Sequence, residues 1–559
     1  MEGAAVVART LKALEVTDVF GVVGRPVTNI AMMAQAEGIH FWSFRNEQAA
    51  SYAAGAAGYM TGRPAVCLAV SGPGVVHALA GLGNAWANCW PMVLIGGATS
   101  TDHSEMGGFQ EAPQIETVRP YVKMACRAES LARVPFYIEK AIRVAMYGRP
   151  GPTYVELPAE VIYDLMDESK LVLPRPVPPP PLTFADPKSV RAALELLKTA
   201  KNPLVIVGKG TAYARAEAEA THFVEKTGLP FLPTPMGKGV LSDEHSQSVA
   251  AARNLALQSA DVILLLGARL NWILHFGQTP RYNKDVKFIH VEIAPEELNN
   301  SVRAEVALAG DIKAVLTQLN DLLAKSPFQF PKASPWWNAL NDKVAKNKAV
   351  NAKLCADERM PLSYYRALKG VHDTLPHDAI IVSEGANTMD IGRTIFDNRL
   401  PRHRLDAGTW GTMGVGMGFA IAAQVVHPGK KVVAIEGDSA FGFSGMEIET
   451  MCRYGLNVCT VIINNNGISM GVEDLSGFEK PNVPFFVYTP QARYEKLIEA
   501  FGGKGYYVTK PEEIEPAMRD ALAQKCPTIV NIMIDTAATR KPQEHPFELG
   551  ATLGGKAKL

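Results

Sequence analysis

Short apolar runs alternate with longer segments in which apolar residues recur at helical spacing, from one end of the chain to the other. A continuous apolar run is typical of a strand buried on both faces, and the amphipathic segments between the runs predict covering helices. This alternation predicts parallel α/β sheets. The runs form three successive sets, which are VFGVVG, AVCLAV and MVLIGG, then PLVIVG, VILLLG and FIHVEI, then AIIVS, VVAIEG, VCTVIINN and IVNIMI.

Two stretches that lack this pattern separate the three sets. The first is LPRPVPPPPL, residues 173–182, whose prolines can neither join the centre of a sheet nor continue a helix, so it predicts a linker. The second is polar and lysine-rich, around 336–358. We therefore expect α/β domains, each with a central, mainly parallel sheet flanked by helices, and a loop-like tail or flap, with the bounds 1–170, 183–340, 360–540 and 541–559.

Composition and charge narrow the class of protein. A chain of 559 residues is too long for one ordinary core. Lys plus Arg and Asp plus Glu number 56 each, so the chain shows no electrostatic footprint for nucleic acid. No apolar stretch is long enough to span a membrane without Gly, Pro or charge. The 7 cysteines are scattered and form no CxxC pair, which indicates reduced thiols in a non-secreted protein.

Residues 430–471 contain the most informative pattern, KKVVAIEGDSAFGFSGMEIETMCRYGLNVCTVIINNNGISMG. The pattern predicts a strand–turn–helix–strand unit, the arrangement in which two parallel strands lie side by side. The predicted elements are a strand over Lys431–Glu436, a tight turn over Gly437–Ala440, a helix over Ser444–Tyr454 and a strand over Val458–Ile463.

Asp438 and Asn465 follow these two strands, at the sheet edge where open α/β sheets bind ligands. The Asp438 carboxylate, the Asn465 amide oxygen and the Gly467 carbonyl can take one side of a hard divalent cation, and Mg²⁺ prefers such ligands. Backbone amides at Ser439 and Ala440, with the serine hydroxyl, can hold a diphosphate. Taken alone, however, the pattern also fits an ordinary turn and strand end.

This segment resembles the thiamine-diphosphate signature of the family that includes acetolactate synthase, pyruvate decarboxylase and oxalyl-CoA decarboxylase, in which Gly-Asp-x precedes Asn-Asn after a spacer. Ser439 is similar to the variant found in oxalyl-CoA decarboxylases and 2-hydroxyacyl-CoA lyases. The resemblance covers nearly the whole chain and implies a pyrimidine-binding N-terminal domain, a Rossmann-like central domain and a C-terminal diphosphate/Mg-binding domain. Its other motifs are FRNEQAASYAAGAAGYMTGRPAVCLAVSGPG, GGFQEAPQ, VGKGTAYA, GARLNW, SEGANT and AGTWGTMGVGMG.

The resemblance assigns roles to residues around the cofactor. Glu47 in RNEQ matches the carboxylate that protonates the aminopyrimidine and so favours its imino tautomer. Gly411 matches the backbone carbonyl that holds the 4′-amino group, and Met413 the bulky residue that bends the cofactor into a V. Asn387 and Thr388 match the diphosphate-side loop. Without the resemblance, these residues would be ordinary helix-end, core or turn residues.

The same architecture implies partners and cofactors. Glu47 and the magnesium site belong to different subunits in this family, so we expect a homodimer or homotetramer with active sites at the dimer interface. The expected cofactors are thiamine diphosphate and Mg²⁺, and the expected substrate is an acyl-CoA. In this family the central domain holds flavin, a nucleotide, part of a CoA ester or nothing, and VGKGTAYA does not decide, since it lacks the third glycine of a dinucleotide fingerprint.

Several residues resemble the lyase branch of the family, in particular His77 in SGPGVVHAL and Gln110 in GGFQEAPQ, although His77 can equally be structural. Asn466 and ATRK at 538–541 are also similar to that branch. Two residues depart from both branches: Arg25 replaces an aliphatic residue, and Ser469 replaces a tyrosine. Both are expected to face the substrate, so they bear on chain-length preference.

We therefore expect cleavage of 2-hydroxyacyl-CoA to formyl-CoA and an aldehyde shortened by one carbon. Oxalyl-CoA decarboxylase, which gives formyl-CoA and carbon dioxide, is the alternative. Acetolactate synthase and a non-catalytic paralogue are more remote alternatives. A non-catalytic paralogue is expected to have lost Glu47, Asp438 or Asn465, and all three are present.

Two further expectations concern CoA binding and location. Arg253, Arg269 and Arg404 can meet CoA phosphates, although surface basic residues are usually only solvated. The ending Ala557-Lys558-Leu559 resembles the Ser-Lys-Leu peroxisomal address. It predicts the peroxisomal matrix for a eukaryotic source and otherwise a cytoplasmic enzyme.

Overall fold

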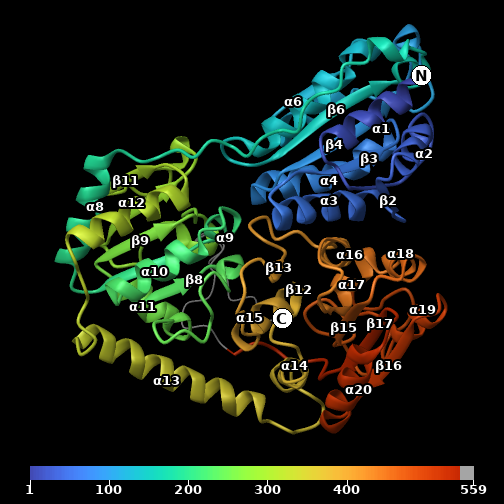
Figure 1. The fold of residues 1–559 in the computed structure, drawn as a ribbon. Helices are drawn as coiled ribbons and strands as arrows, with labels where there is room; N and C mark the ends of the chain where they lie inside the picture. The colour runs from blue at the N-terminus through green and yellow to red at the C-terminus, as the bar shows by residue number, and fades with distance from the viewer. Residues whose placement is uncertain (542–559) are drawn as a thin grey trace.

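The computed structural model describes residues 1–541, and within them the chain forms three parallel sheets with helices on both faces (Figure 1). The sheets have six, five and six strands in chain order. The expected three-sheet α/β fold is therefore confirmed, while the exact domain bounds stay predictions. Most of the predicted tail, and the C-terminal tripeptide, lie outside the described residues. Among those residues, no helix combines the length and apolar character needed to cross a membrane.

The N-terminal sheet has the strand order β2-β1-β3-β4-β6-β5 and every pairing in it is parallel. Its strands are β1 Asp18–Gly21, β2 His40–Ser43, β3 Ala65–Ala69, β4 Met92–Ala98, β5 Ala125–Arg127 and β6 Pro152–Pro158. Its helices are α1 Gly3–Ala13, α2 Thr28–Ala36, α3 Glu47–Thr61, α4 Pro73–Asn88, α5 Gln114–Val118, α6 Val134–Met146 and α7 Ala159–Tyr163.

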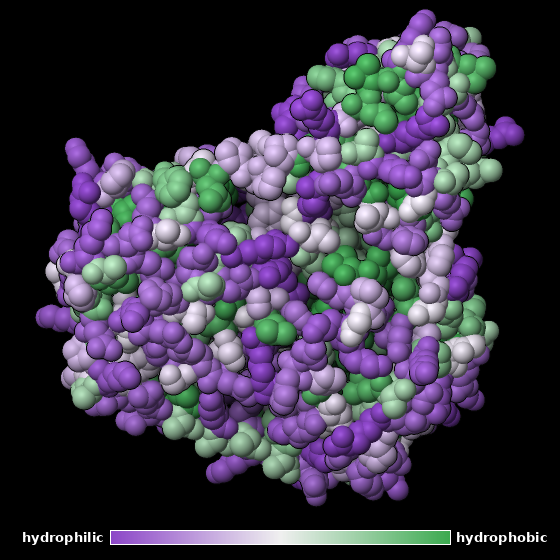
Figure 2. Space-filling model, in the orientation of Figure 1, coloured by the Kyte–Doolittle hydropathy of each residue, from purple (hydrophilic) through white to green (hydrophobic). Residues whose placement is uncertain are grey.

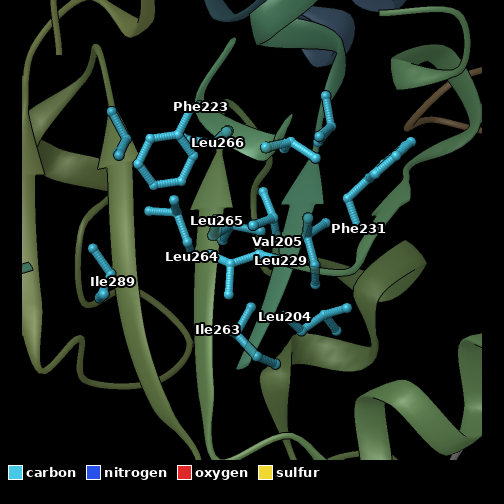
Figure 3. Close-up of a cluster of buried hydrophobic side chains, with 14 of the residues drawn as sticks. Leu204, Val205, Phe223, Leu229, Phe231, Ile263, Leu264, Leu265, Leu266 and Ile289 are labelled. Atoms are coloured by element: carbon cyan, nitrogen blue, oxygen red, sulfur yellow. The ribbon is translucent and has the colours of Figure 1, made fainter. Parts of the chain in front are cut away.

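The central sheet has the order β11-β10-β9-β7-β8, and Figure 3 shows apolar side chains of its core, which come from β7, β9 and neighbouring segments. Its strands are β7 Pro203–Val207, β8 Phe231–Pro233, β9 Val262–Leu266, β10 Lys287–Glu292 and β11 Val306–Ala309. Its helices are α8 Pro187–Thr199, α9 Lys209–Tyr213, α10 Glu217–Thr227, α11 Arg253–Ser259 and α12 Ile312–Lys325.

The C-terminal sheet has the order β13-β12-β14-β15-β17-β16, so β12, β14 and β15 are neighbours near its centre. Its strands are β12 Ile380–Glu384, β13 Arg404–Asp406, β14 Val432–Gly437, β15 Val458–Asn464, β16 Lys504–Val508 and β17 Thr528–Met533. Its helices are α14 Tyr364–His372, α15 Ala386–Ile395, α16 Gly416–Val426, α17 Asp438–Ser444, α18 Glu447–Tyr454, α19 Glu495–Glu499 and α20 Pro511–Ala523.

The two stretches between the sheets have different structures. Residues 171–186 form neither helix nor strand, as the proline-rich sequence predicts. The lysine-rich stretch is instead a helix, α13 Pro335–Cys355, which runs along the lower edge of the molecule in Figure 1. Trp336 and Trp337 in its first turn are buried against the central domain, while most of its later residues are solvent-exposed. The lysine-rich boundary stretch is therefore helical, since a solvated helix can have the same polar composition as a loop.

The turn expected at 437–440 is also a helix. After β14 the chain enters α17 directly at Asp438, and Ala440 and Phe441 of this helix are buried. The predicted helix over Ser444–Tyr454 corresponds to α18, and only its first residue, Ser444, belongs to α17. Asp438 consequently lies in the first turn of a helix, where several backbone N–H groups have no partner within the helix.

The N-terminal and C-terminal domains share a hydrophobic core, whereas the central domain has its own. Helices α3 and α16 pack against each other, and the Phe419 ring lies 6.4 Å from Tyr52 and 5.3 Å from Trp90 between ring centroids. Figure 1 shows the blue helices of the first domain directly above the orange helices of the third. In Figure 2 the surface in this orientation is mostly hydrophilic, with separate apolar patches on the first domain and in the hollow beneath it.

Candidate functional site

The carboxyl ends of β12, β14 and β15 meet at one edge of the C-terminal sheet and bring together most of the predicted cofactor residues. A Cβ placed on Gly437 would lie 3.5 Å from the Thr388 hydroxyl, so the end of β14 and the start of α15 lie close together. The Gly467 N–H, beyond β15, donates to Asp438 Oδ2 at 2.9 Å. The juxtaposition expected from the two strand ends is therefore present.

Asp438 is a buried carboxylate, only 2% exposed. Burial raises its pKa to about 7, although the N–H groups of Ser439 and Gly467, which donate to it, oppose that rise. Asn465 is equally buried, and its side-chain nitrogen has no hydrogen-bond partner. Because nitrogen and oxygen of an amide are interchangeable by a flip, Asn465 can offer an oxygen at this point. A divalent cation would favour the ionised carboxylate and use that oxygen, so these residues fit the expected metal.

The predicted diphosphate residues lie beside this carboxylate. Asn387 and Thr388 are in the first turn of α15, whose first N–H groups have no partner within the helix. Asn387 hydrogen-bonds the phenol of Tyr364, whose pKa is raised to about 12 mainly by burial. The Ser439 hydroxyl lies 3.0 Å from the hydroxyl of Tyr488. Backbone donors and hydroxyl groups thus surround the strand ends, which is the donor set that a diphosphate requires.

The loop between β13 and α16 carries Gly411 and Met413. Gly411 adopts φ +66°, and a Cβ there would meet no atom within 4 Å, so the backbone borders open space. The Thr412 hydroxyl donates to the Asn84 side chain at 3.0 Å, which ties the loop to α4. The open space at Gly411 is compatible with close approach of a cofactor ring.

A second group of predicted residues lies in the N-terminal domain. Glu47 is the first residue of α3, and its side chain is 12% exposed. Its Oε2 lies 3.1 Å from Nδ1 of His77, which comes from the first half of α4. The Gln110 carbonyl accepts a hydrogen bond from the Ser71 hydroxyl at 2.7 Å, just before α4 begins. The structure therefore brings Glu47, His77 and Gln110 to one end of α4.

The Glu47 group and the Asp438 group do not meet. Within residues 1–541, no hydrogen bond or ion pair connects Glu47, His77 or Gln110 to the residues around Asp438. Exposed apolar side chains lie close to both groups in sequence. They include Val76, Met106 and Phe109 near the first group, and Phe443, Ile468, Met470 and Phe485 near the second.

The two departures from the family pattern lie near these groups. Ser469 is exposed, with φ +68°, in the loop that follows Gly467. Arg25 is exposed in the turn after β1. A Cβ on the adjacent Gly24 would lie 2.7 Å from the Val70 side chain, and one on Gly74 would lie 2.5 Å from Val70 and 3.4 Å from Glu47. One valine therefore separates the backbone next to Arg25 from the Glu47 site.

The three arginines expected to meet CoA do not converge. Arg253 donates to the Ile273 carbonyl at 2.7 Å and is partly buried. Arg269 donates to the Ala87 carbonyl. Arg404 is wholly buried beside Asp406, so its guanidinium offers no accessible group to a phosphate in this structure.

Arg269 lines a cavity of about 470 Å³ that the sequence did not predict. The cavity lies between the end of α4, the central domain and the linker prolines 179–181, and Trp90 and Lys209 also line it. Lys209 donates to the Asn88 side chain at 2.7 Å, and burial lowers its pKa to about 7. The partial glycine motif VGKGTAYA, which holds Lys209, was the signal in the sequence.

Buried carboxylates at the strand and helix ends were also missed. Glu384 ends β12 and accepts N–H donors from Gly414 and Gly416, at the start of α16. Glu436 is its direct neighbour on β14, and neither of its carboxylate oxygens has a hydrogen-bond partner. Burial raises the pKa of Glu384 to about 7, and burial together with Glu384 raises that of Glu436 well above its ordinary value. A third buried carboxylate belongs to Glu447, at the start of α18.

These features define a thiamine pyrophosphate enzyme, and the chain belongs to that family. The family's N-terminal TPP binding domain matches residues 1–117 of this chain, the family's central domain matches residues 190–319, and the family's C-terminal TPP binding domain matches residues 384–532. The chain is 51% identical to 2-hydroxyacyl-CoA lyase 1 of Mus musculus over 557 residues, which covers 97% of this chain and 96% of that protein.

Two further relatives represent the two branches expected from the sequence. The 2-hydroxyacyl-CoA lyase of Arabidopsis thaliana is 44% identical, covering 96% of each chain. The oxalyl-CoA decarboxylase of Escherichia coli K12 is 43% identical, covering 96% of this chain and 95% of its own length. The expected family is thus confirmed, and with it dependence on thiamine diphosphate.

Proposed function

We propose that this enzyme cleaves 2-hydroxyacyl-CoA to formyl-CoA and an aldehyde shortened by one carbon. The observation that carries this proposal is the pairing of Glu47 with His77, because it puts a second proton-transfer group beside the carboxylate that serves the cofactor. The lyase relatives, which match nearly the whole chain, support the same reaction. Oxalyl-CoA decarboxylation remains the alternative, supported by the bacterial relative.

Mg²⁺ and the cofactor are assigned to the two groups of residues described above. Asp438, Asn465 and Gly467 would hold the metal through the buried Asp438 carboxylate, the Asn465 amide oxygen and the Gly467 carbonyl. When bound, thiamine diphosphate supplies the carbon nucleophile and the electron sink for cleavage next to a carbonyl. The remaining cofactor contacts are Ser439, Ala440, Asn387 and Thr388 at the diphosphate and Gly411, Met413 and Glu47 at the pyrimidine.

Residues of the chain then move the substrate's protons. His77 faces Glu47 through Nδ1, and its side chain is 59% exposed, so Nε2 is available to take the proton from the substrate 2-hydroxyl. The Gln110 side chain can both donate and accept, and it orients the carbonyl group. Decarboxylation of oxalyl-CoA has no hydroxyl proton to remove, so His77 is needed only for the lyase reaction.

A comparison of two substrates tests this proposal. The purified protein, supplied with thiamine diphosphate and Mg²⁺, is given a 2-hydroxyacyl-CoA and oxalyl-CoA in parallel assays of formyl-CoA release. We expect the larger kcat/KM for the 2-hydroxyacyl-CoA, and His77→Gln to lower only that value, by about 100-fold for loss of a proton-transfer group. If oxalyl-CoA is the better substrate, the decarboxylase alternative replaces the lyase.

We also propose that the active unit is a homodimer or a dimer of dimers. The separation of the Glu47 and Asp438 groups, and the exposed apolar residues near each, support a site completed by a second copy. Arg253 and Arg269 stay proposed CoA contacts. Delivery to peroxisomes stays a prediction for a eukaryotic source.

A further inference from the structure

Glu447 belongs to the C-terminal domain, but its carboxylate binds the backbone of the N-terminal domain. It is the first residue of α18 and is 1% exposed. The backbone N–H of Arg45 donates to its two oxygens at 3.1 and 3.3 Å, and the N–H of Asn46 also donates to it. The buried Thr450 hydroxyl donates to Oε2 at 2.7 Å and fixes the carboxylate in this direction.

The backbone that Glu447 holds leads directly into Glu47. Asn46 is the N-cap of α3, and its side chain accepts the N–H of Gln48 at 2.7 Å. Glu47 follows as the first helical residue. The position of its carboxylate therefore depends on the two backbone N–H groups that Glu447 fixes, since they immediately precede it.

Other side chains of α18 hold the strand that precedes this turn. The Tyr454 hydroxyl accepts the N–H of Ser43 at 2.9 Å and donates to the Phe41 carbonyl at 3.2 Å. Arg453 donates to the Ser43 carbonyl at 2.8 Å. Together with Glu447, they make α18 a support for the whole segment from the end of β2 to the start of α3.

A buried carboxylate is an expensive means of joining two domains. Taking it out of water costs free energy that backbone donors only partly return, and apolar residues of similar size often stabilise a fold better. Burial raises the pKa of Glu447 to about 7, which reflects that cost. A carboxylate is useful here because it accepts several N–H groups at once and so fixes the backbone in one position.

We propose that Glu447 is a positioning residue that holds Glu47 in the geometry needed to activate the cofactor. This inference rests on the proposed role of Glu47. A displacement of about 1 Å can cost about 100-fold in a proton-transfer step, so loss of the Glu447 contacts should slow activation without removing the cofactor. The metal and diphosphate residues lie on α15, on α17 and after β15 rather than on α18, so we expect them to remain in place.

The test measures hydrogen–deuterium exchange at C2 of the bound cofactor by acid quench and proton NMR. We expect Glu447→Gln to slow exchange by about 10- to 100-fold, while the dissociation constants of thiamine diphosphate and Mg²⁺, measured by calorimetry, stay within about twofold of the parent. The control is Glu515→Gln on α20 of the same domain, because its exposed carboxylate pairs with Arg519 four residues further along its own helix. It should exchange at the parent rate.

Two further variants separate the possible failures. Thr450→Val keeps the shape but removes the hydroxyl that orients Glu447, so it replaces Glu447→Gln if that variant does not fold, and it should slow exchange in the same direction. Glu47→Gln reports on the proposed function itself. Slow exchange in Glu47→Gln with parent exchange in both Glu447→Gln and Thr450→Val would overturn the positioning role alone. Parent exchange in Glu47→Gln would overturn the role of Glu47.

Discussion

Asp438 shows how one residue can combine burial with metal binding. Its carboxylate is almost inaccessible, yet its hydrogen-bond donors are backbone N–H groups rather than a cationic side chain. Such a group is costly without a cation, and the raised pKa reflects this. The site is therefore arranged so that metal binding supplies the missing positive charge.

Asp438→Ala should abolish the thermal stabilisation that thiamine diphosphate and Mg²⁺ give together. In the parent, ligand at about 100 times its dissociation constant adds about 2.7 kcal/mol to the free energy of unfolding. The measurement is the Tm with and without both ligands. Asp520→Ala, which removes an exposed carboxylate of α20, is the control and should keep the full shift. A full shift in Asp438→Ala would place the metal elsewhere.

Ser469→Tyr should reduce the range of acyl chains that the enzyme accepts. With Ser469 in its proposed position facing the substrate, the tyrosine would fill space that the serine leaves, and each methylene excluded from a pocket changes kcat/KM by about 10-fold or more. Long and branched 2-hydroxyacyl-CoA substrates should therefore lose more kcat/KM than the two-carbon one. Ser476→Tyr, at another exposed serine of the same segment, serves as the control. Equal losses for all chain lengths would contradict the assigned position of Ser469.

At the scale of elements, buried carboxylates tie helix starts to distant segments. Glu384 at the end of β12 accepts the N–H groups of Gly414 and Gly416, where α16 begins. A carboxylate at a helix N-terminus is favoured both by the free N–H groups and by the helix dipole. Since Gly411 and Met413 precede this helix start, Glu384 joins the loop proposed to contact the pyrimidine to the strand that leads to Asn387 and Thr388.

Glu384→Gln should weaken cofactor binding by about 10-fold, since a hydrogen bond to a charged group contributes about 1.5–3 kcal/mol and the amide can accept only at its oxygen. Quenching of tryptophan fluorescence on titration with thiamine diphosphate measures the dissociation constant. Asp378→Asn, just before β12, removes an exposed pair with Lys430 and should bind as the parent does. Parent affinity in Glu384→Gln would show that the loop is held by other contacts.

Central strands were predictable from sequence, and edge strands were less so. The continuous apolar runs match β9, β14 and β15 closely, because a strand with neighbours and helices on all sides must be apolar throughout. The edge strands β5 and β11 are short and partly exposed, so their runs are mixed. Helix α13 buries few residues, at its start and at Cys355, so its sequence shows only a weak apolar period.

The residues of the candidate site likewise differ in how well the sequence could predict that they lie together. Asp438 and Asn465 could be placed together, because adjacent parallel strands end at the same edge. The contact between Glu447 and Arg45 joins residues far apart in the chain and leaves no periodicity or spacing in the sequence. The cavity around Lys209 is lined by segments of all three domains, and although several of them carry motifs, no spacing in the sequence shows that they meet.

At the scale of the whole molecule, the proposed dimer would bring the Glu47 group of one chain to the Asp438 group of another. Neither group is complete, and no described contact brings Glu47 to Asp438. In a symmetric dimer, each site would take Glu47 from one subunit and Asp438 from the other. This arrangement can be tested with two inactive variants.

Mixing Glu47→Gln with Asp438→Ala subunits, after dissociation and reassembly, should restore about a quarter of the parent activity. Half of the dimers in an equal mixture are hybrids, and each hybrid has one intact site and one doubly altered site. Formyl-CoA release measures the recovery, and each variant reassembled alone should stay inactive. If the mixture stays inactive although hybrids form, both residues act within one chain.

The hydrophobic core that the first and third domains share should hold them together after the chain is cleaved between them. The contact between α3 and α16 is part of the shared core and is protected from proteases. Residues 171–186 have no regular structure and are mostly exposed, so proteases can reach their peptide bonds. Limited digestion there should give two fragments on a denaturing gel that elute as one particle from a sizing column under native conditions. The first fragment, expressed separately, should then reassociate with the remainder, so that the covalent order of the domains is dispensable for their contact.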